Sequence, residues 1–450
     1  MKKWNGLILV FVLILSLVQP HVGYAEDSLV LNGKVSGQIA DETNRQVFKI
    51  ELTQKGLLFI DLKSWIDVVE YRVFDESGEE FTNRYVYSDP VTPKTDTVYY
   101  DLEVGTYYVE LEQYSKGTNG KFEISTLFTP YNTNDIEPNN GTEQAQNLSF
   151  NKKTKGFISR QDENDVYQVK LRRAGRLEID FTSLIFTHAE FYLTDEFGKL
   201  IDRQTVNSEW KTPGVYKKSV DLEPGTYYIE IESWDAPRMT GTYELFAKFQ
   251  AANNQEKESN NGITEAMPLA FYRPLTGFLA WNDIQDFYKI VLPKASKVTL
   301  DAQLYVNNNT DVEVYDQRFN QVHYNQVTSS STTPKRYTES FALKAGTYYV
   351  AIKAWDERRD TGKYVLQVKS SHLLPPLTVN TVTTKSTAIT GKTEKNAVVS
   401  FKVGKKTYTR KADSKGNYSF KISKQKAGSI INVSTKNKYG TTAKRIAVKK

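Results

Sequence analysis

The sequence predicts an all-β protein built from tandem β-sandwich domains. A Gly-Thr-Tyr-Tyr run occurs at residues 105–108, 225–228 and 346–349, and its glycines lie 120 and 121 residues apart, the period of an internal repeat. The 450 residues include 28 Tyr and 22 Phe but only 3 Met, a bias typical of β structure. Short apolar runs end at Gly, Asn or Pro and show no helical periodicity, which favours sandwiches.

Each copy of the run predicts a turn followed by a half-buried strand. We expect the Gly to end the turn with a positive φ, which costs glycine little. In the second copy, Tyr227, Ile229 and Ile231 alternate with polar or amphipathic residues, so they face the core. One buried face and one solvated face are typical of an antiparallel strand.

The spacing of matching elements sets the domain organisation. From an opening Gly (37, 156 or 277) to the Gly of the repeated run there are 68, 69 and 69 residues. The predicted segments are a signal peptide at 1–25, three repeats at 26–130, 134–249 and 255–370, and a different domain at 377–450.

Residues 1–25 predict a secretory signal peptide cut after Ala25. Lys2 and Lys3 precede the apolar run Leu7–Val18, and small residues mark the cleavage site. The alternative is an uncleaved anchor, although the run is shorter than the roughly 20 apolar residues of a membrane span. The chain has no Cys, so an exported protein of this kind relies on its cores and lacks thiol catalysis and Cys-based zinc sites.

The order of short motifs resembles a known family. In the second repeat it runs Glu-Pro-Asn-Asn (137–140), Gly-Phe-Ile-Ser (156–159), Asp162 with Asp165-Val-Tyr, then Gly-Thr-Tyr-Tyr and Gly-Thr-Tyr (241–243). This order resembles the bacterial pre-peptidase C-terminal domain, to which the collagen-binding domains of clostridial collagenases are related. The resemblance covers roughly residues 29–370. It implies three jelly-roll-like β-sandwiches that bind rather than cleave.

The last domain is similar to a bacterial immunoglobulin-like domain. The similarity lies in a Thr-Gly-Lys-Thr-Glu-Lys-Asn-Ala-Val-Val run from Thr390 and an Ala-Asp-Ser-Lys-Gly-Asn-Tyr-Ser-Phe run from Ala412. The complete prediction is therefore an all-β chain of three jelly-roll-like sandwiches and a C-terminal Ig-like sandwich. Pre-peptidase-type modules accompany secreted peptidase domains, but no such catalytic domain is found in this sequence.

Calcium is the predicted cofactor, because it prefers six to eight oxygen ligands from carboxylates, amides and backbone. In two repeats such residues precede the first strand and occupy the turn after it: Glu137, Asn139, Asn140, Asp162 and Asp165, then Glu258, Asn260, Asn261, Asp283 and Asp286. The related collagen-binding domains hold calcium at this corner. The first repeat has Thr43 and Gln46 at matching positions, so we expect no metal there. The alternative is that these residues only form solvated turns.

Aromatic residues on and just after the repeated strands are candidate ligand contacts. They are Tyr108, Tyr228 and Tyr349 on the outward face, and Tyr114, Trp234 and Trp355 past the strand ends. Aromatic rings on a sheet can stack on sugars or lie along an extended polypeptide with little loss of entropy. The alternative is that they cap sandwich edges or pack at domain joints.

Charge is divided sharply along the chain. Residues 376–450 hold 18 Lys and Arg against 2 Asp and Glu, a net charge of +16, and the rest of the mature chain holds 39 against 51, a net charge of −12. Such a basic domain accumulates at polyanions, for which we single out Lys402, Lys405, Lys406, Arg410, Lys411, Lys444 and Arg445. We expect binding to an anionic wall polymer or lipid surface, and no base-specific nucleic-acid binding. The alternative is a merely soluble surface.

Catalytic motifs are not found. The mature chain holds only His188, His323 and His372, and neither a His-Glu-x-x-His nor a Gly-x-Ser-x-Gly motif occurs. The sequence therefore predicts a monomeric, non-enzymatic, secreted binding protein for polypeptide or glycan. Without a Leu-Pro-x-Thr-Gly sorting signal, we expect non-covalent retention at the cell wall. The alternatives are a secreted hydrolase or its accessory subunit, and a structural spacer.

Overall fold

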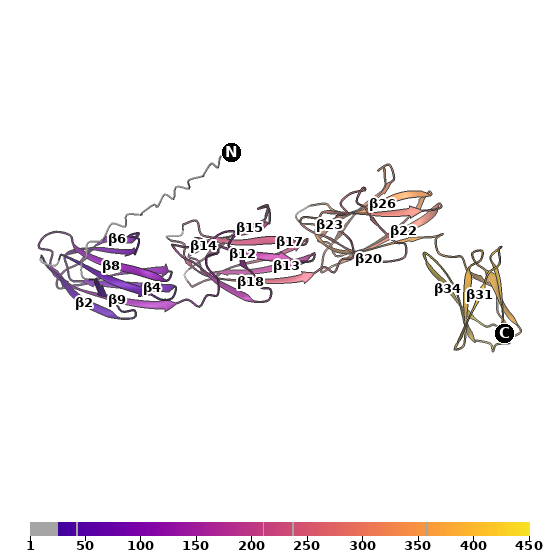
Figure 1. The fold of residues 1–450 in the computed structure, drawn as a ribbon, viewed down its shortest axis with the longest axis horizontal. Coiled ribbons are helices and arrows are strands. Elements are labelled where there is room, and N and C mark those ends of the chain that lie inside the picture. Colours follow the sequence, from indigo (N-terminus) through magenta and orange to yellow (C-terminus); the bar gives the residue numbers. More distant parts are fainter. Residues whose placement is uncertain (1–25, 42–43, 210, 236–237, 357–358) are drawn as a thin grey trace, which may run out of the picture.

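Four β-domains follow one another along the chain in the computed structural model (Figure 1). The structure describes residues 26–450 except 42–43, 210, 236–237 and 357–358, so the predicted signal peptide lies outside the described residues. Across the described ranges, no helix has the length and apolar character needed to cross a bilayer. The prediction of an all-β chain is confirmed.

Each repeat is a sandwich of a five-stranded and a four-stranded sheet. In the first repeat the larger sheet has the order β1 (Glu26–Ser28), β3 (Arg45–Leu52), β8 (Gly105–Gln113), β5 (Val68–Asp75), β6 (Glu80–Tyr87). The smaller sheet has the order β2 (Lys34–Ile39), β9 (Gly120–Pro130), β4 (Gly56–Ser64), β7 (Lys94–Leu102). Most connections pass from one sheet to the other, so strands far apart in sequence become neighbours.

The second repeat has the same strand order. Its sheets are β10 (Gln146–Asn147), β12 (Asn164–Leu171), β17 (Gly225–Glu232), β14 (Thr187–Asp195), β15 (Leu200–Ser208), and β11 (Lys153–Ile158), β18 (Gly241–Ala251), β13 (Gly175–Ser183), β16 (Gly214–Leu222). In both repeats the short first strand pairs in parallel with the next strand of its sheet, and the longer ladders are antiparallel.

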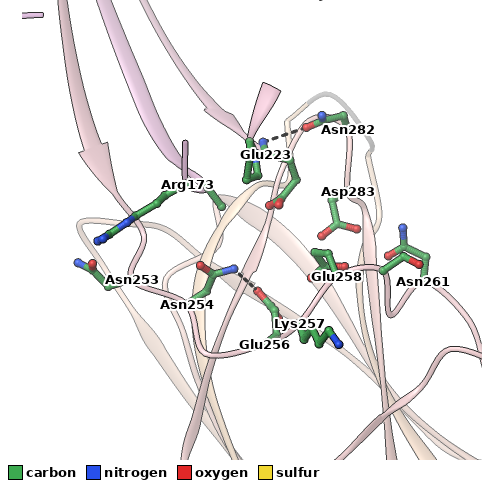
Figure 2. A pocket seen from close by; sticks show the side chains of 13 residues that line it. Arg173, Glu223, Asn253, Asn254, Glu256, Lys257, Glu258, Asn261, Asn282 and Asp283 are labelled. Atoms are coloured by element: carbon green, nitrogen blue, oxygen red, sulfur yellow. Dashed lines mark hydrogen bonds between the residues drawn. The ribbon is translucent and has the colours of Figure 1, made fainter. Parts of the chain in front are cut away.

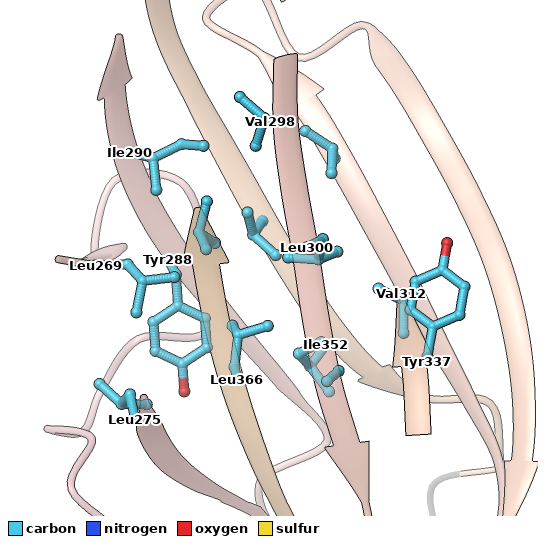
Figure 3. Close-up of a cluster of buried hydrophobic side chains, with 14 of the residues drawn as sticks. Leu269, Leu275, Tyr288, Ile290, Val298, Leu300, Val312, Tyr337, Ile352 and Leu366 are labelled. Atoms are coloured by element: carbon cyan, nitrogen blue, oxygen red, sulfur yellow. The ribbon is translucent and has the colours of Figure 1, made fainter. Parts of the chain in front are cut away.

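The third repeat completes the series. Its sheets are β19 (Met267–Pro268), β21 (Gln285–Leu292), β26 (Gly346–Ala354), β23 (Asn308–Asp316), β24 (Gln321–Ser329), and β20 (Leu275–Leu279), β27 (Gly362–Ser370), β22 (Ser296–Leu304), β25 (Lys335–Leu343). Figure 3 shows its core, where Leu300, Ile352 and Leu366 from three strands are fully buried. The alternation of β22 buries every second residue, as a two-layer sandwich requires.

The turn before each Gly-Thr-Tyr-Tyr strand differs from the expectation. Gly105 and Gly225 do not have a positive φ, so the prediction of a left-handed turn glycine was wrong for these copies, and only Gly346 has one, at 156°. The first Tyr instead folds back and its hydroxyl donates to a carbonyl four residues earlier: Tyr107 to Glu103 at 3.0 Å, Tyr227 to Glu223 at 2.8 Å and Tyr348 to Lys344 at 3.2 Å. The Gly lies against the ring edge, where a Cβ at Gly225 would be 3.3 Å from the Tyr227 hydroxyl. This is the tyrosine-corner arrangement of β-sandwiches.

The last domain is a smaller sandwich. Its sheets are β28 (Thr378–Val379), β29 (Ala388–Lys392), β32 (Asn417–Lys421), and β31 (Lys406–Lys411), β30 (Val398–Val403), β33 (Ile430–Asn437), β34 (Gly440–Ala447). Phe401, Ile431 and Val433 are among its buried core residues. Tyr439 joins this domain to the third repeat by packing edge-on against Phe271, with ring centroids 6.4 Å apart.

Candidate cation sites and binding surfaces

Carboxylates converge at one corner of the second repeat. Asp135, Glu137 and Asp165 each offer an oxygen within 4.8 Å of the other two. The segment before β10 carries the first two, and β12 carries Asp165 near its start. The Val166 amide donates to the Asn139 carbonyl at 2.8 Å and holds this segment against β12. The structure thus brings together the two groups of predicted ligands.

The third repeat has the same corner. Glu256, Glu258 and Asp286 offer oxygens within 4.8 Å of one another, and the Phe287 amide donates to the Asn260 carbonyl at 2.8 Å. Figure 2 shows Glu258 and Asp283 turned toward a shared pocket, with Asn261 at its edge. The pocket has a volume of about 750 Å³.

Sequence reasoning missed Asp135 and Glu256. Each precedes the predicted Glu by two residues, so the corner sequence is Asp-x-Glu-x-Asn-Asn in one repeat and Glu-x-Glu-x-Asn-Asn in the other. An acid at the same offset in two divergent copies was the available signal. Both acids lie inside the predicted repeats, just upstream of the Glu-x-Asn-Asn motif.

A pair of tyrosines forms the inner wall of each corner. In the third repeat the Tyr364 hydroxyl donates to Asp286 Oδ2 at 2.5 Å, and the Tyr288 hydroxyl donates to Glu256 Oε2 at 2.6 Å. In the second repeat the Tyr243 hydroxyl donates to Asp165 and lies 2.6 Å from the Tyr167 hydroxyl. These bonds orient one carboxylate oxygen inward and leave the other for a ligand, as outer-shell partners do around metals.

Several polar atoms in both corners are buried without a partner. Asn139 and Asn260 are 0% exposed, and neither the nitrogen nor the oxygen of either side chain has a hydrogen bond. The remaining unpaired atoms are Asp135 Oδ1, both oxygens of Asp162, Asp165 Oδ1, Asp283 Oδ2 and Asp286 Oδ1. Buried polar atoms in folded proteins are nearly always paired, so this concentration marks both corners as candidate ligand sites.

The two outer asparagines differ from their buried neighbours. Asn140 is exposed, and its carbonyl accepts a bond from the Asn164 amide at 3.1 Å. The Asn261 amide lies 2.7 Å from Asp283 Oδ1 and 2.8 Å from the Gln285 carbonyl. With its side-chain nitrogen turned inward, Asn261 donates to both of these oxygens.

Burial and mutual repulsion disfavour the charged carboxylates. Burial, and then the charge of Glu137, raises the pKa of Asp162 to about 7. Burial, and then Glu258, raises the pKa of Asp283 to about 8. Burial also raises the pKa of Asp165 and Asp286 well above the ordinary range of aspartate. A bound divalent cation would reverse this cost, and an all-oxygen donor set of carboxylates and amides fits calcium.

The first repeat has different side chains at the positions that form this inner wall. Gln46, Phe48 and Phe122 stand where the other repeats have Asp, Tyr and Tyr, and the two Phe rings pack edge to face with centroids 5.7 Å apart. Thr43 lies outside the described residues. Without a carboxylate on β3 at this position, the corner has lost its central donor.

The six predicted aromatic residues divide into two groups. Tyr108, Tyr228 and Tyr349 are half-buried on the outer sheet face, and Tyr108 stacks on Phe74 with centroids 5.4 Å apart. The three residues past the strand ends are exposed: Tyr114 by 57%, Trp234 by 60% and Trp355 by 65%. Arg203 lies 5.5 Å from the Trp234 ring.

The seven predicted basic residues of the last domain are all exposed. They lie on or beside one sheet, but on both of its faces. Lys402 and Arg445 share the outward face, whereas Arg410 and Lys444 pair with Val399 and Val433, whose side chains point to the core. Within residues 376–450, all of which the structure describes, no Lys or Arg forms an ion pair. The Asp413 carboxylate accepts backbone bonds from Lys415 and Asn417 instead.

Comparison with known proteins gives a match for the last domain. The family model described as a bacterial Ig domain matches residues 375–449. Residues 375–449 form a bacterial Ig domain. The resemblance found in the sequence is thus confirmed for this part of the chain. The bacterial Ig domain is therefore the part of the chain that carries the large positive charge.

The remainder matches other proteins. Collagenase ColA of Clostridium perfringens is 25% identical over 249 residues, which are 53% of this chain and 22% of the collagenase, so the chain spans about a fifth of that relative. The pre-peptidase C-terminal domain of a Bacillus anthracis collagenase is 21% identical, with a TM-score of 0.20, over 26% of this chain and all of that domain. Tandem CBM51 modules of a Streptococcus pneumoniae family 98 glycoside hydrolase are 12% identical, with a TM-score of 0.19, over 48% of this chain and 84% of theirs.

Proposed function

We propose that this chain is an exported, non-catalytic binding protein of the cell envelope or extracellular matrix. Its three repeats bind a polypeptide or glycan polymer, with calcium stiffening the second and third. Its bacterial Ig domain holds the chain non-covalently at an anionic cell-wall polymer or lipid surface.

The observation that carries the proposal is an exposed aromatic side chain at the same position in all three repeats. Tyr114, Trp234 and Trp355 each stand nine residues after the Gly of the repeated run, and each is more than half exposed. Large aromatic rings are enriched at binding surfaces, because they offer a wide contact area with little loss of entropy. Three equivalent rings in one chain favour a polymer, because several weak contacts then act together.

Retention of the chain on insoluble polymers tests the binding role. Collagen, peptidoglycan and xylan would each be incubated with the full chain and with the triple variant Tyr114→Ala, Trp234→Ala, Trp355→Ala. The expected result is retention on one polymer and a loss of at least tenfold in the triple variant. Phe197→Ala is the control, because this ring is 87% exposed in a different turn. Equal retention of all three proteins would contradict the proposal.

The charge of the bacterial Ig domain supports the attachment role. Its +16 charge is not neutralised by ion pairs within residues 376–450, so long-range attraction to a polyanion is strong. Binding to teichoic acid and to phosphatidylglycerol vesicles would be measured at rising salt. We expect a steep loss of affinity with salt, and a weaker slope after charge removal at Lys402, Lys411 and Arg445. Stronger binding to one of the two ligands identifies the surface.

The calcium role is tested by melting the full chain in calcium and in EDTA. A ligand that binds only the folded state at a hundred times its Kd adds about 2.7 kcal/mol. Asp165→Asn together with Asp286→Asn should abolish the calcium-dependent rise in Tm. Asp180→Asn is the control, because this half-exposed carboxylate pairs with Lys217 and belongs to neither acidic group. No calcium-dependent rise in the unmodified chain would overturn this part of the proposal.

A peptidase-associated role is the second candidate, favoured by the match to a collagenase. Here the repeats would present substrate to a separate catalytic chain. Release of peptides from collagen by the purified chain alone would support hydrolysis. An increase seen only when a peptidase is added would support the accessory role.

A further inference from the structure

The two joints between repeats use the same contacts. Asp101 accepts a hydrogen bond from Thr240 of the next repeat at 2.7 Å, and Asp221 accepts one from Thr361 at 2.9 Å. These positions are equivalent in the repeat: each Asp precedes the Leu of the repeated turn, and each Thr precedes the first Gly of a β-strand. The joint is therefore a repeated feature of the chain.

The turn that carries a predicted cation ligand lies directly against the preceding repeat. Gln161, next to Asp162, bonds to the Tyr107 hydroxyl at 3.2 Å, and Asn282, next to Asp283, donates to the Tyr227 hydroxyl at 3.3 Å. Trp281 enters the core of the second repeat with only 8% of its surface exposed.

A carboxylate of the preceding repeat faces each corner. The Glu223 amide donates to the Asn282 side chain at 3.1 Å, and Glu223 Oε1 is buried without a partner. Figure 2 shows the Glu223 carboxylate pointing into the pocket that Asp283 and Glu258 also face. Burial, and then Glu258 and Glu256, raises the pKa of Glu223 to about 8. Glu103 holds the same position at the first joint, and its Oε1 is also buried without a partner.

The third copy of the turn provides an internal comparison. Ala342 and Lys344 stand where the first two copies have Asp and Glu, and both are exposed. The domain that follows this copy in the chain is the bacterial Ig domain, not another repeat. The two acids thus occur only where a repeat with a cation corner follows.

We propose that Glu103 and Glu223 are ligands, direct or through water, of the cation held by the following repeat, so that one calcium ion bridges two repeats and fixes their joint. The inference rests on the proposed calcium corners and adds a donor from the preceding repeat. Calcium suits this role because it accepts up to eight oxygens in flexible geometry.

The second joint is the sharper place to test the inference. Among the described residues, no Lys or Arg forms an ion pair with the acids of this joint, which are Glu223, Glu256, Glu258, Asp283 and Asp286. Arg173 and Lys257 line the pocket, but Figure 2 shows both side chains directed away from Glu223. The test is calcium titration calorimetry on the full chain, with small-angle X-ray scattering in calcium and in EDTA. The variants are Glu223→Gln and Asp286→Asn, with Glu178→Gln as an exposed control.

The inference predicts that Glu223→Gln weakens one calcium site by at least tenfold and broadens the distance distribution in calcium, while Glu178→Gln changes neither. Circular dichroism would show that the Gln variant keeps its β structure. The bridge would be overturned if Glu223→Gln bound calcium with the same affinity as the unmodified chain while Asp286→Asn lost the site. The calcium corner itself would then still stand. No calcium binding by the unmodified chain would overturn both.

Discussion

Gly156 lies directly opposite Tyr243 in the ladder between β11 and β18, and the Tyr243 ring covers the space that a side chain at residue 156 would need. The same ring carries the hydroxyl that donates to Asp165. The opening Gly of the repeat is therefore required for the inner wall of the acidic corner, because only its missing Cβ lets the ring lie flat across the strand.

Gly156→Ala should lower the stability of the second repeat. The new methyl group would overlap the Tyr243 ring, and overpacking of this kind costs about 1–3 kcal/mol. Gly105→Ala is the matched control, because the nearest atom to its Cβ would be the Tyr107 hydroxyl at an ordinary 3.6 Å and its φ is not positive. Thermal melting would measure both. An equal loss in the control would mean that the turn does need a glycine backbone.

Tyr364→Phe should weaken the corner of the third repeat. The hydroxyl is fully buried, and its loss leaves Asp286 Oδ2 without its donor, at a cost of about 1–3 kcal/mol. We expect a lower Tm in EDTA and a weaker calcium site. Tyr418→Phe, which removes a 2.6 Å bond to the Thr378 carbonyl, is a control that affects only the bacterial Ig domain. Unchanged calcium affinity in Tyr364→Phe would show that the tyrosine does not position the carboxylate.

Lys55→Ala should strengthen calcium binding at the first joint. Lys55 Nζ lies 3.1 Å from Asp135 Oδ2, and its charge competes with a cation for the same corner. The second repeat has Ala174 at the matching position. We expect an affinity gain of roughly tenfold, which corresponds to about 1.4 kcal/mol. Lys199→Ala, at the second joint but over the Trp281 ring, is the control. Weaker binding in Lys55→Ala would contradict the competition.

Asp301→Asn should destabilise the third repeat in a pH-dependent way. Hydrogen bonds from Arg336, and also from Lys369, lower the pKa of Asp301 to about 2. Because the pKa in the folded state is below that in the unfolded chain, the stabilisation is present above about pH 4 and is lost as the pH falls toward 2. The Tm difference between Asp301→Asn and the unmodified chain should therefore be larger at pH 6 than at pH 3.

The control for this experiment is Asp180→Asn. Asp180 is the equivalent residue of the second repeat, but its pair with Lys217 is 3.4 Å long and largely exposed, so only a small Tm change is expected. If the Tm difference between Asp301→Asn and the unmodified chain did not shrink in acid, the substitution would act through lost packing and not through the lost charge.

The fold could be predicted because its signals are local and repeated. Alternation from Tyr227 to Ile231 fixes the buried face of β17, and the period of the Gly-Thr-Tyr-Tyr run fixes the number of sandwiches. The expected positive φ at Gly105 was wrong, because the Tyr107 hydroxyl closes this turn by donating to the Glu103 carbonyl and the glycine backbone keeps an ordinary conformation.

The sites could be predicted only within a repeat. Asp165 and Asp286 stand in a recognisable turn, and the structure places both at buried corners. Asp135 and Glu256 were missed because they stand upstream of the Glu-x-Asn-Asn motif, at the very start of the predicted repeats. Glu223 could not be found from spacing, because its contact with the next corner depends on how two repeats meet.

The replacements at the two ends of the array have a consequence for assembly. A head-to-tail surface that repeats within a chain can also join separate chains into an open filament. Here the leading surface of the first repeat has Gln46 and Phe122 in place of the ligand and its tyrosine, and the trailing surface of the third has Ala342 and Lys344 in place of the acids. Each unmatched end lacks groups found at the two internal joints, so we expect that two separate chains cannot join there through the same set of contacts.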